Sequence, residues 1–586
     1  MGPFDGPHDR TGGTMHDLVI RNGLIVDGTG ADRFHGDVSV DGGRITEVVP
    51  TGGGDVGPGR EELDADGCLV APGWVDIHTH YDGQVTWDPE MAPSSWHGAT
   101  TVVMGNCGVG FAPARPDERD FLIELMEAVE DIPGTALHEG IDWQWESFGE
   151  YLDALEAMPR TIDVGAQLPH AALRAYVSGR DAHEDDLDAD QLAELSRIAE
   201  GAVRDGALGF STSRTILHTS KHGLIPGTTA LPDELLAVAH GMVKGGPAVF
   251  QIISDGITHV PEEQAWVREI ADMPGMTVTY SLAQSPRDPQ GFRAALDEAW
   301  AMRDEGRAVI PQVPARPTGM LFGLQSSLHP FILHPTHREL ADRPLAERVA
   351  ALRDPDVRAR LLAEEPRTRN RIALRMVTNW DEIFRLGTDC DYEPAPEQSV
   401  ASVARREGRS EQEVVLDWLL EEDGTAFLFA PLGSYVEKDH DAIRAMIEHP
   451  ASAVGLSDGG AHCGLICDAS FPTYLLTHWA RARTRGDTLP LELVVHKQTK
   501  ATADVYGLGD RGVLAAGKRA DVKVFDLVGL RLHAPHMMHD LPAGGRRLVQ
   551  PVDGYRWTVQ SGQVTFADGE ATGARPGRVV RGRRAG

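Results

Sequence analysis

Short apolar runs alternate with longer amphipathic segments through the middle of the chain, between residues 73 and 514. Over residues 188–204, apolar side chains recur every three or four positions, which is typical of a helix with one buried face. Eight apolar runs have the length and composition of core strands, namely residues 74–78, 100–104, 162–168, 207–211, 248–253, 276–281, 308–313 and 453–457. Because a closed (β/α)8 barrel contains eight parallel strands alternating with helices, the pattern predicts an α/β fold of the TIM-barrel type.

The two ends of the chain share a different pattern, in which Gly and polar turn residues separate short Val-rich and Ile-rich alternations. It covers residues 17–50 and returns over residues 517–570. Neither end has enough small antiparallel strands to bury a face alone. We therefore predict one small β-sandwich domain built from residues 15–72 and 515–586, the second part including a C-terminal tail.

A long segment, residues 314–450, interrupts the alternation inside the predicted barrel of residues 73–514. It contains helical stretches such as residues 401–421 and the Pro-rich and His-rich sequence LHPFILHPTH. We expect an inserted lid over the barrel mouth. Ahead of these units, the Gly-rich and polar residues 1–14 predict a disordered leader. A length of 586 residues suggests about four domains by itself, but the patterns favour two domains and an insertion.

Charge narrows the set of partners. The chain has 88 Asp and Glu against 55 Lys and Arg, which gives a formal net charge of -33. This balance repels phosphate backbones and anionic membrane surfaces, so we expect a small-molecule substrate, no nucleic acid and no membrane partner. Five cysteines form no disulfide framework, no secretory signal precedes residue 15, and no run of eighteen apolar residues occurs. The sequence therefore predicts a cytoplasmic protein and leaves a homo-oligomer open.

The strongest local motif, APGWVDIHTHYDG, places His78 and His80 two positions apart at the end of a predicted strand. Alternate side chains of a strand point to the same face, and at the C-terminal end of a barrel strand that face is the active-site mouth. Because imidazole is a common zinc ligand, the pair indicates a metal site. The alternative is two polar residues that only close a strand.

A second motif, ATTVVMGNCGVG, brings Cys107 to the end of the next predicted strand, on a turn rich in Gly. A thiolate here would bind zinc. A small buried cysteine with no chemical role is the commoner state of a free Cys. A nucleophilic cysteine is a third interpretation, although no partner histidine is identifiable.

A third motif, AVGLSDGGAHCG, places Asp458 at the end of the last predicted strand, before two glycines. A carboxylate there can contact a metal and its water, and can move a proton as general base and then general acid. A turn or helix-capping aspartate is the alternative. His462 and Cys463 follow as candidate auxiliary ligands.

These motifs together resemble a known family. The ordered segments GLIVDGTG, APGWVDIHTH, TTVVMGNCGVGFAP, GALGFSTS, GLSDGGAH and GDRGVLAAGKRADVKVFD are similar to those of the amidohydrolase superfamily. The cysteine in TTVVMGNCG is narrower and resembles the N-acyl-D-amino-acid deacylase (D-aminoacylase) group. The resemblance spans nearly the whole chain from Met15, and it implies a (β/α)8 barrel flanked by a β-sandwich, with one or two zinc ions and amide hydrolysis.

Carried over residue by residue, the resemblance makes His78 and His80 metal ligands and Cys107 a ligand in place of a carboxylated lysine. It makes Asp458 both a ligand and the catalytic acid/base. The segment QLPHAALRAYVSG also looks like a family segment, which implies a catalytic role for His170 near the pocket.

The fifth and sixth strands depart from the family, which supplies one histidine on each. Here Gln251 and Ser254 or Asp255 stand where the fifth-strand ligand is expected, and residues 280–284 stand where the sixth-strand ligand is expected. The family's basic residue beside the sixth-strand histidine, which helps bind a substrate carboxylate, is also absent. These departures from the family favour one zinc ion rather than two, and they leave D-amino-acid specificity open.

Two further groups of residues are candidates around such a site. The first group, which we expect to contact the substrate, consists of Gln251, Tyr280 and His462. Three loop histidines could replace the missing ligands: His218, His222 and His259.

The leading hypothesis is a zinc-dependent hydrolase of a C–N bond, an amide, that acts on N-acyl amino acids. One alternative is hydrolysis of a cyclic amide, imide or lactone, which uses the same chemistry. An alternative of another class is a non-catalytic binding protein that keeps the fold. Retention of His78, His80 and Asp458 together favours an enzyme.

Overall fold

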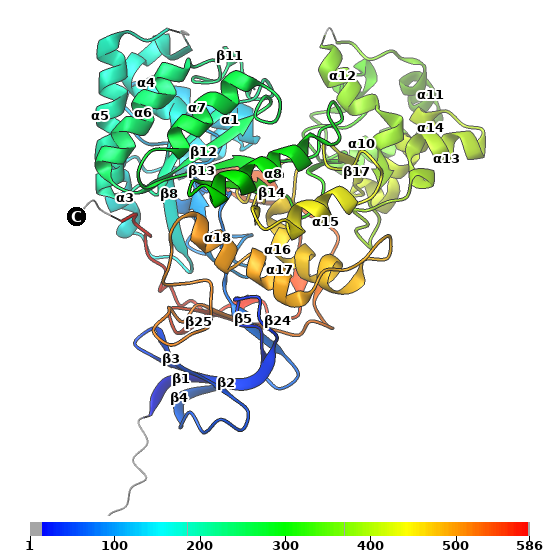
Figure 1. The fold of residues 1–586 in the computed structure, drawn as a ribbon. Coiled ribbons are helices and arrows are strands. Elements are labelled where there is room, and N and C mark those ends of the chain that lie inside the picture. Colours follow the sequence, from blue (N-terminus) through cyan, green and yellow to red (C-terminus); the bar gives the residue numbers. More distant parts are fainter. Residues whose placement is uncertain (1–14, 184–185, 369, 584–586) are drawn as a thin grey trace, which may run out of the picture.

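A computed structural model describes residues 15–183, 186–368 and 370–583. Eight parallel strands form its central sheet, in chain order from one edge to the other (Figure 1). They are β6 Trp74–Asp76, β7 Ala99–Met104, β8 Asp163–Pro169, β9 Gly209–Arg214, β12 Ala248–Ser254, β13 Met276–Ser281, β14 Ala308–Val313 and β18 Ala453–Val454. Each predicted run therefore overlaps a strand, although the first strand ends at Asp76 and the last at Val454, earlier than predicted, and β9 begins and ends later than predicted.

Backbone hydrogen bonds join the segments that follow the first and the last strand of this sheet. His80 N donates to Gly459 O at 2.7 Å, and Asp458 N donates to His78 O at 3.1 Å. Thr79 and Gly459 form a parallel bridge. Since this link connects the two edges of the sheet, the strands curl into a barrel. It also places the first and third sequence motifs side by side.

Helices cover the outside of the barrel (Figure 1). They include α1 Arg119–Glu130, α2 Gly134–Gly140, α3 Phe148–Glu156, α4 His170–Ser178, α5 Ala189–Asp205, α6 Pro232–Gly245, α7 Pro261–Ala271, α8 Gly291–Asp304, α15 Asp441–Glu448, α17 Leu491–Lys497 and α18 Lys500–Val505. The predicted helix over residues 188–204 is α5: Asp188 caps its first turn by accepting from Gln191 N, and Gly206 ends it at a φ of 115°.

Strands from both terminal regions of the chain form one nine-strand sheet (Figure 1). Its strands are β1 His16–Ile25, β2 Phe34–Asp41, β3 Arg44–Pro50, β4 Gly59–Asp64, β5 Leu69–Pro72, β19 Val522–Phe525, β24 Tyr555–Gln560, β25 Gln563–Ala567 and β26 Glu570–Ala571. As predicted, β1, β2 and β3 are antiparallel neighbours, whereas β4 and β5 run parallel to β1. β19 pairs with β5 and so joins the two ends. The predicted leader, residues 1–14, lies outside the described residues.

The inserted segment has a hydrophobic core of its own and extends beside the barrel helices (Figure 1). It contains β15 Gly319–Phe322, β16 Phe384–Arg385, β17 Leu428–Pro431, α9 Pro335–Leu340, α10 Leu345–Arg353, α11 Pro355–Ala363, α12 Arg371–Thr378, α13 Val400–Glu407 and α14 Glu411–Leu419. The helical stretch predicted over residues 401–421 is two helices, because Gly408 ends α13 with a φ of 66° and Ser410 caps α14.

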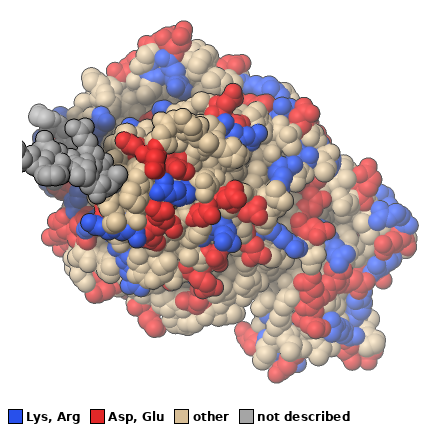
Figure 2. All heavy atoms as spheres, turned by 90° about the horizontal axis from the view of Figure 1, so that it is seen from below, with Lys and Arg blue, Asp and Glu red and all other residues tan. Residues whose placement is uncertain are grey.

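The surface carries the acidic excess without a continuous basic patch on the face in Figure 2, where Lys and Arg side chains lie among Asp and Glu. This face gives no support to a nucleic acid partner. Among the described residues, no helix combines the length and the apolar character needed to span a bilayer.

A buried ion network fastens the start of β8 to the chain after the barrel. Asp163 accepts from Arg511 Nη1 at 2.8 Å and lies 2.9 Å from Arg519 Nη2. Asp163→Ala leaves these guanidinium groups without that carboxylate, so we expect the free energy of unfolding to fall by about 3–5 kcal/mol. Glu194→Ala, which breaks an exposed pair with Arg197, should cost about 0.5 kcal/mol. Equal losses in urea denaturation would contradict this.

Candidate metal centre

His78 and His80 lie directly after β6, inside the barrel mouth, and each side chain is only 1% exposed. Thr79, between them, points the other way, because its Oγ1 donates to Val103 O at 2.9 Å. The alternation of a strand therefore continues past the last ladder residue. It presents both imidazoles to the same side, as the motif predicts.

Cys107 joins the two histidines. The residue has a φ of 54° on a turn between Gly105 and Gly108, which turns its side chain back toward the barrel. Its Sγ lies 3.3 Å from His78 Nε2. One donor atom each from His78, His80 and Cys107 lie within 4.8 Å of one another.

Asp458 closes the group from the opposite edge of the sheet. Its Oδ1 is 3.4 Å from His78 Nε2 and 3.7 Å from His80 Nε2. The side chain is 14% exposed, so it is the member of the group that solvent reaches most easily. Like Cys107, it has a left-handed backbone, with a φ of 49°. The structure thus brings four predicted ligands together.

Gln312, at the C-terminal end of β14, orients His78. Its Oε1 lies 3.0 Å from His78 Nδ1. An amide oxygen can only accept, so Nδ1 carries the proton and Nε2 keeps its lone pair for a metal. The sequence analysis missed this residue, although a polar residue near the end of an apolar strand is a signal that could have found it.

Glu130, the last residue of α1, supports the second histidine. It is buried, with Oε1 3.3 Å from His80 Nδ1 and Oε2 3.5 Å from His462 Nε2. The sequence offers no signal for it, because it ends an amphipathic helix fifty residues away from His80. The predicted residue His462 therefore reaches the site through Glu130.

Burial and charge shift the pKa values of the group in different directions. Burial lowers the pKa of His78 to about 4 and raises that of Cys107 to about 12. Burial opposes the charged form of His80 as well, but the carboxylates of Glu130 and Asp458 raise its pKa well above the usual range. Despite burial, the hydrogen bond from His80 and the nearby histidines hold the pKa of Asp458 below its usual range.

The donor set fits a divalent transition metal. Two imidazoles, a thiol and a carboxylate are common zinc ligands. The buried carboxylate of Glu130 faces His80 Nδ1 at 3.3 Å, so the other ring nitrogen, Nε2, is the one turned toward His78 and Asp458. A carboxylate on the far nitrogen of a metal-binding histidine is a common support of zinc sites.

His170 and Tyr280, two further predicted site residues, are engaged elsewhere. His170 Nδ1 lies 2.8 Å from Thr212 Oγ1, and its Nε2 lies 2.7 Å from Glu234 Oε1. Tyr280 donates to Ala295 O of α8 at 3.3 Å, so its ring faces the helices. The structure does not bring either side chain to the four ligands.

Gln251 does reach the group, since its Oε1 accepts from Cys107 N at 3.1 Å. Ser254, which ends the same strand, and Asp255, which follows it, do not: Ser254 Oγ donates to Glu263, and Asp255 accepts from Ile216 N. No histidine stands at this position, as the sequence shows. The fifth strand therefore contributes an amide in place of a metal ligand.

One of the three candidate loop histidines lies close to the centre. Burial and the charges of His462 and His80 lower the pKa of His218 to about 3. The ring bonds Ser213 Oγ through Nδ1, at 2.9 Å. By contrast, His222 contacts Glu124 and His259 contacts Thr258, both on exposed loops.

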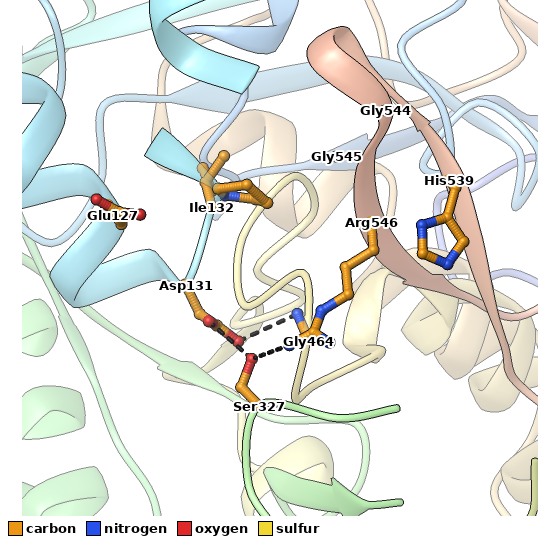
Figure 3. A pocket seen from close by; sticks show the side chains of 10 residues that line it. Glu127, Asp131, Ile132, Ser327, Gly464, His539, Gly544, Gly545 and Arg546 are labelled. Carbon is orange, nitrogen blue, oxygen red and sulfur yellow. Dashed lines mark hydrogen bonds between the residues drawn. The ribbon is translucent and has the colours of Figure 1, made fainter. Parts of the chain in front are cut away.

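A cavity of about 380 Å³ borders the loop that follows the last barrel strand (Figure 3). Asp131, after the end of α1, accepts from Ser327 Oγ at 2.9 Å and from Gly464 N at 3.1 Å. Arg546, on the hairpin of β21 His536–Leu541 and β22 Gly545–Val549, points to Ser327 from the other side. The insertion therefore contacts the loop that holds the third motif.

The comparison with protein families agrees with this fold. The Amidohydrolase family matches residues 61–566, most of the chain. The chain therefore belongs to the amidohydrolase family, and it is a metal-dependent hydrolase of C–N (amide) bonds other than peptide bonds. The binding-protein alternative is set aside.

Several relatives belong to the predicted group. D-aminoacylase of Alcaligenes xylosoxydans xylosoxydans is 28% identical over 87% of this chain and 88% of its own. N-acyl-D-aspartate deacylase of the same organism is 26% identical over 96% and 95%. The structure of Bordetella bronchiseptica N-acyl-D-glutamate deacylase, complexed with zinc and a phosphonate mimic of the tetrahedral intermediate, matches with a TM-score of 0.62, 25% identity and coverage of 97% and 100%.

Proposed function

We propose that this enzyme removes the acyl group from N-acyl-D-amino acids. The observation that carries the proposal is the cluster of His78, His80 and Cys107 at the barrel mouth, with Asp458 beside the two histidines. Similarity to D-aminoacylase and to N-acyl-D-aspartate deacylase along nearly their full lengths supports the substrate class.

We further propose a single zinc ion as the cofactor. His78, His80 and Asp458 would hold it, with Cys107 as the fourth ligand. The ion supplies Lewis-acid activation of water and of the scissile carbonyl. A second ion at this centre lacks strand ligands, because Gln251 replaces an imidazole on the fifth strand and Tyr280 on the sixth faces away.

The protein residues then divide the work. Asp458, whose pKa lies below its usual range, is ionised at neutral pH and accepts a proton from the attacking water. It then returns this proton to the departing amine nitrogen. Asp458 is the most solvent-exposed of the proposed ligands, so a substrate that enters through the mouth reaches it most easily. Gln312 and Glu130 keep His78 and His80 oriented. His462 and Gln251 lie beside the reacting centre and are proposed to contact the substrate.

Zinc binding should release a proton from Cys107 if that thiol is a ligand. Burial keeps the pKa of Cys107 near 12, so the thiol is protonated at pH 7 before the ion binds and must lose its proton to coordinate. Calorimetry in buffers with different ionisation enthalpies gives the number of protons released. We expect Cys107→Ser to release about one proton fewer than the wild type.

Cys463→Ser is the matched control for that measurement. Cys463 is also buried, with its pKa also raised to about 12, but its Sγ donates to Gly460 O, three residues earlier in its own loop. This variant should release as many protons as the wild type. Equal release by the wild type and Cys107→Ser would exclude Cys107 as a ligand.

A substrate panel tests the proposed reaction. It contains N-acetyl amino acids of both configurations, cyclic amides and lactones, each assayed with zinc and with a chelator. We expect zinc-dependent release of acetate from the D isomers, at a kcat/KM about 10-fold or more above that of the L isomers. Faster turnover of the cyclic amides or lactones would instead support the alternative of ring opening.

A further inference from the structure

A second group of potential metal ligands lies outside the barrel, where the insertion returns to it. Glu393 belongs to the insertion, His440 precedes α15, and His478 lies in the π-helix η7 Leu475–Ala482. One donor atom from each lies within 4.8 Å of the others. We propose that these three side chains bind a divalent transition metal ion, with zinc as the ion to be tested, and that the ion fastens the insertion to the barrel.

The distances suit a tetrahedral ion. Glu393 Oε2 lies 3.1 Å from His478 Nε2 and 3.8 Å from His440 Nδ1. Two zinc bonds of about 2.0–2.1 Å at a tetrahedral angle separate the ligand atoms by about 3.4 Å. Small side-chain shifts bring all three atoms into range.

His440 is already in the tautomer that a metal requires. It is fully buried, and its Nε2 lies 2.9 Å from Tyr392 O. A carbonyl can only accept, so Nε2 donates its proton and Nδ1 keeps its lone pair. Tyr474 Oη lies 3.4 Å from Nδ1 and Glu393 Oε2 lies 3.8 Å from it, so an ion here would replace the contact with the Tyr474 hydroxyl. A backbone carbonyl on the other ring nitrogen is the usual support of a metal-binding histidine.

His478 presents Nε2 to the same place. This buried nitrogen faces Glu393 Oε2 at 3.1 Å, so the two atoms lie where one ion could bind both. The ring stacks on Tyr474, with centroids 4.6 Å apart and an angle of 13°, which fixes its plane. It also lies on a π-helical segment, and such segments occur frequently at functional sites.

Glu393 is oriented but not saturated. Arg483 donates to Oε1 at 2.9 Å and to Oε2 at 3.2 Å, and His440 N donates to Oε1 at 2.8 Å. A carboxylate offers about four lone-pair positions, so Oε2 keeps one free, toward the two imidazoles. Arg483 also pairs with Asp441 at 2.8 Å, which offsets its positive charge beside the ion.

Solvent can reach the group. A cavity of about 360 Å³ is lined by Glu393, His478, Tyr474 and Asp391, among others. It provides an entry path, and a water from it could fill the fourth position. The three ligands come from separate segments of the chain, so an ion here would resist movement of the insertion relative to the barrel.

Metal counting tests the proposal without relying on activity. The full-length variant His78→Ala/His80→Ala, which lacks the first site, is equilibrated with zinc and desalted, and its zinc is measured by elemental analysis. We expect about one equivalent per chain, and none after the further change His478→Ala. Zinc should also raise the Tm of the first variant but not of the second. His449→Ala, a partly buried histidine beside Asp297, is the matched control and should keep the equivalent.

If the double variant His78→Ala/His80→Ala does not fold, the same comparison in the wild-type background tests the proposal. Wild type should hold about one equivalent of zinc more than His478→Ala. Two results would show that Glu393 and His478 form only an ion pair. One is a zinc content that His478→Ala leaves unchanged in both backgrounds, and the other is an absence of zinc from His78→Ala/His80→Ala. Neither result bears on the first site, whose failure appears as loss of hydrolysis.

Discussion

Asp458→Asn lowers kcat for hydrolysis of an N-acetyl-D-amino acid by about 10³-fold, within the range of 10²–10⁴ that general acid–base catalysis contributes. The amide keeps the shape of the carboxylate and its oxygen can still contact the ion, but it cannot take a proton from water. Zinc content should therefore remain at the wild-type level. Steady-state kinetics, with elemental analysis of the same sample, measures both quantities.

Asp255→Asn provides the matched control for this change. Asp255 also follows a barrel strand, but its carboxylate accepts from Ile216 N on a neighbouring loop and does not reach the ligands. Its kcat should stay within about 2-fold of the wild type, since surface substitutions away from the site have small effects. If Asp458→Asn retains full turnover, Asp458 is not the acid/base.

Removing a proposed ligand should have the second large effect, on metal affinity. His80→Ala deletes a ligand, so we expect zinc affinity to fall by more than about 100-fold, and hydrolysis at limiting zinc to fall with it. Glu130→Gln keeps the ligand and weakens only its support, so its loss should lie between about 10-fold and 100-fold. Competition with a chromophoric chelator measures both affinities.

A graded result distinguishes a ligand from its support. His222→Ala, an exposed histidine that contacts Glu124, should bind zinc like the wild type. Unchanged affinity in His80→Ala would remove this residue from the site. A larger loss in Glu130→Gln than in His80→Ala would make the carboxylate the ligand and the imidazole its support.

The strands of the barrel and the proposed ligands at their ends could both be predicted from the same feature of the sequence, its short apolar runs. A buried parallel strand is a short apolar run, and the residues that follow it reach the mouth of the barrel. His78, Cys107 and Asp458 each follow such a run, so their convergence could be inferred without coordinates.

Positions that depend on register or on a distant helix were harder. Gln251 pairs with Thr279 across β12 and β13, so the next residue, Tyr280, has the opposite orientation and faces the helices. A shift of one residue therefore separates a pocket residue from a packing residue. Glu130 reaches His80 from the end of a helix, and no periodic pattern encodes that contact.

The central claim is that four side chains hold one ion at the barrel mouth. A zinc-edge anomalous difference map of crystals of the active, zinc-loaded enzyme tests it most directly. We expect one peak there, within bonding distance of His78, His80, Cys107 and Asp458. The absence of a peak at these residues, or two peaks among them, would contradict it.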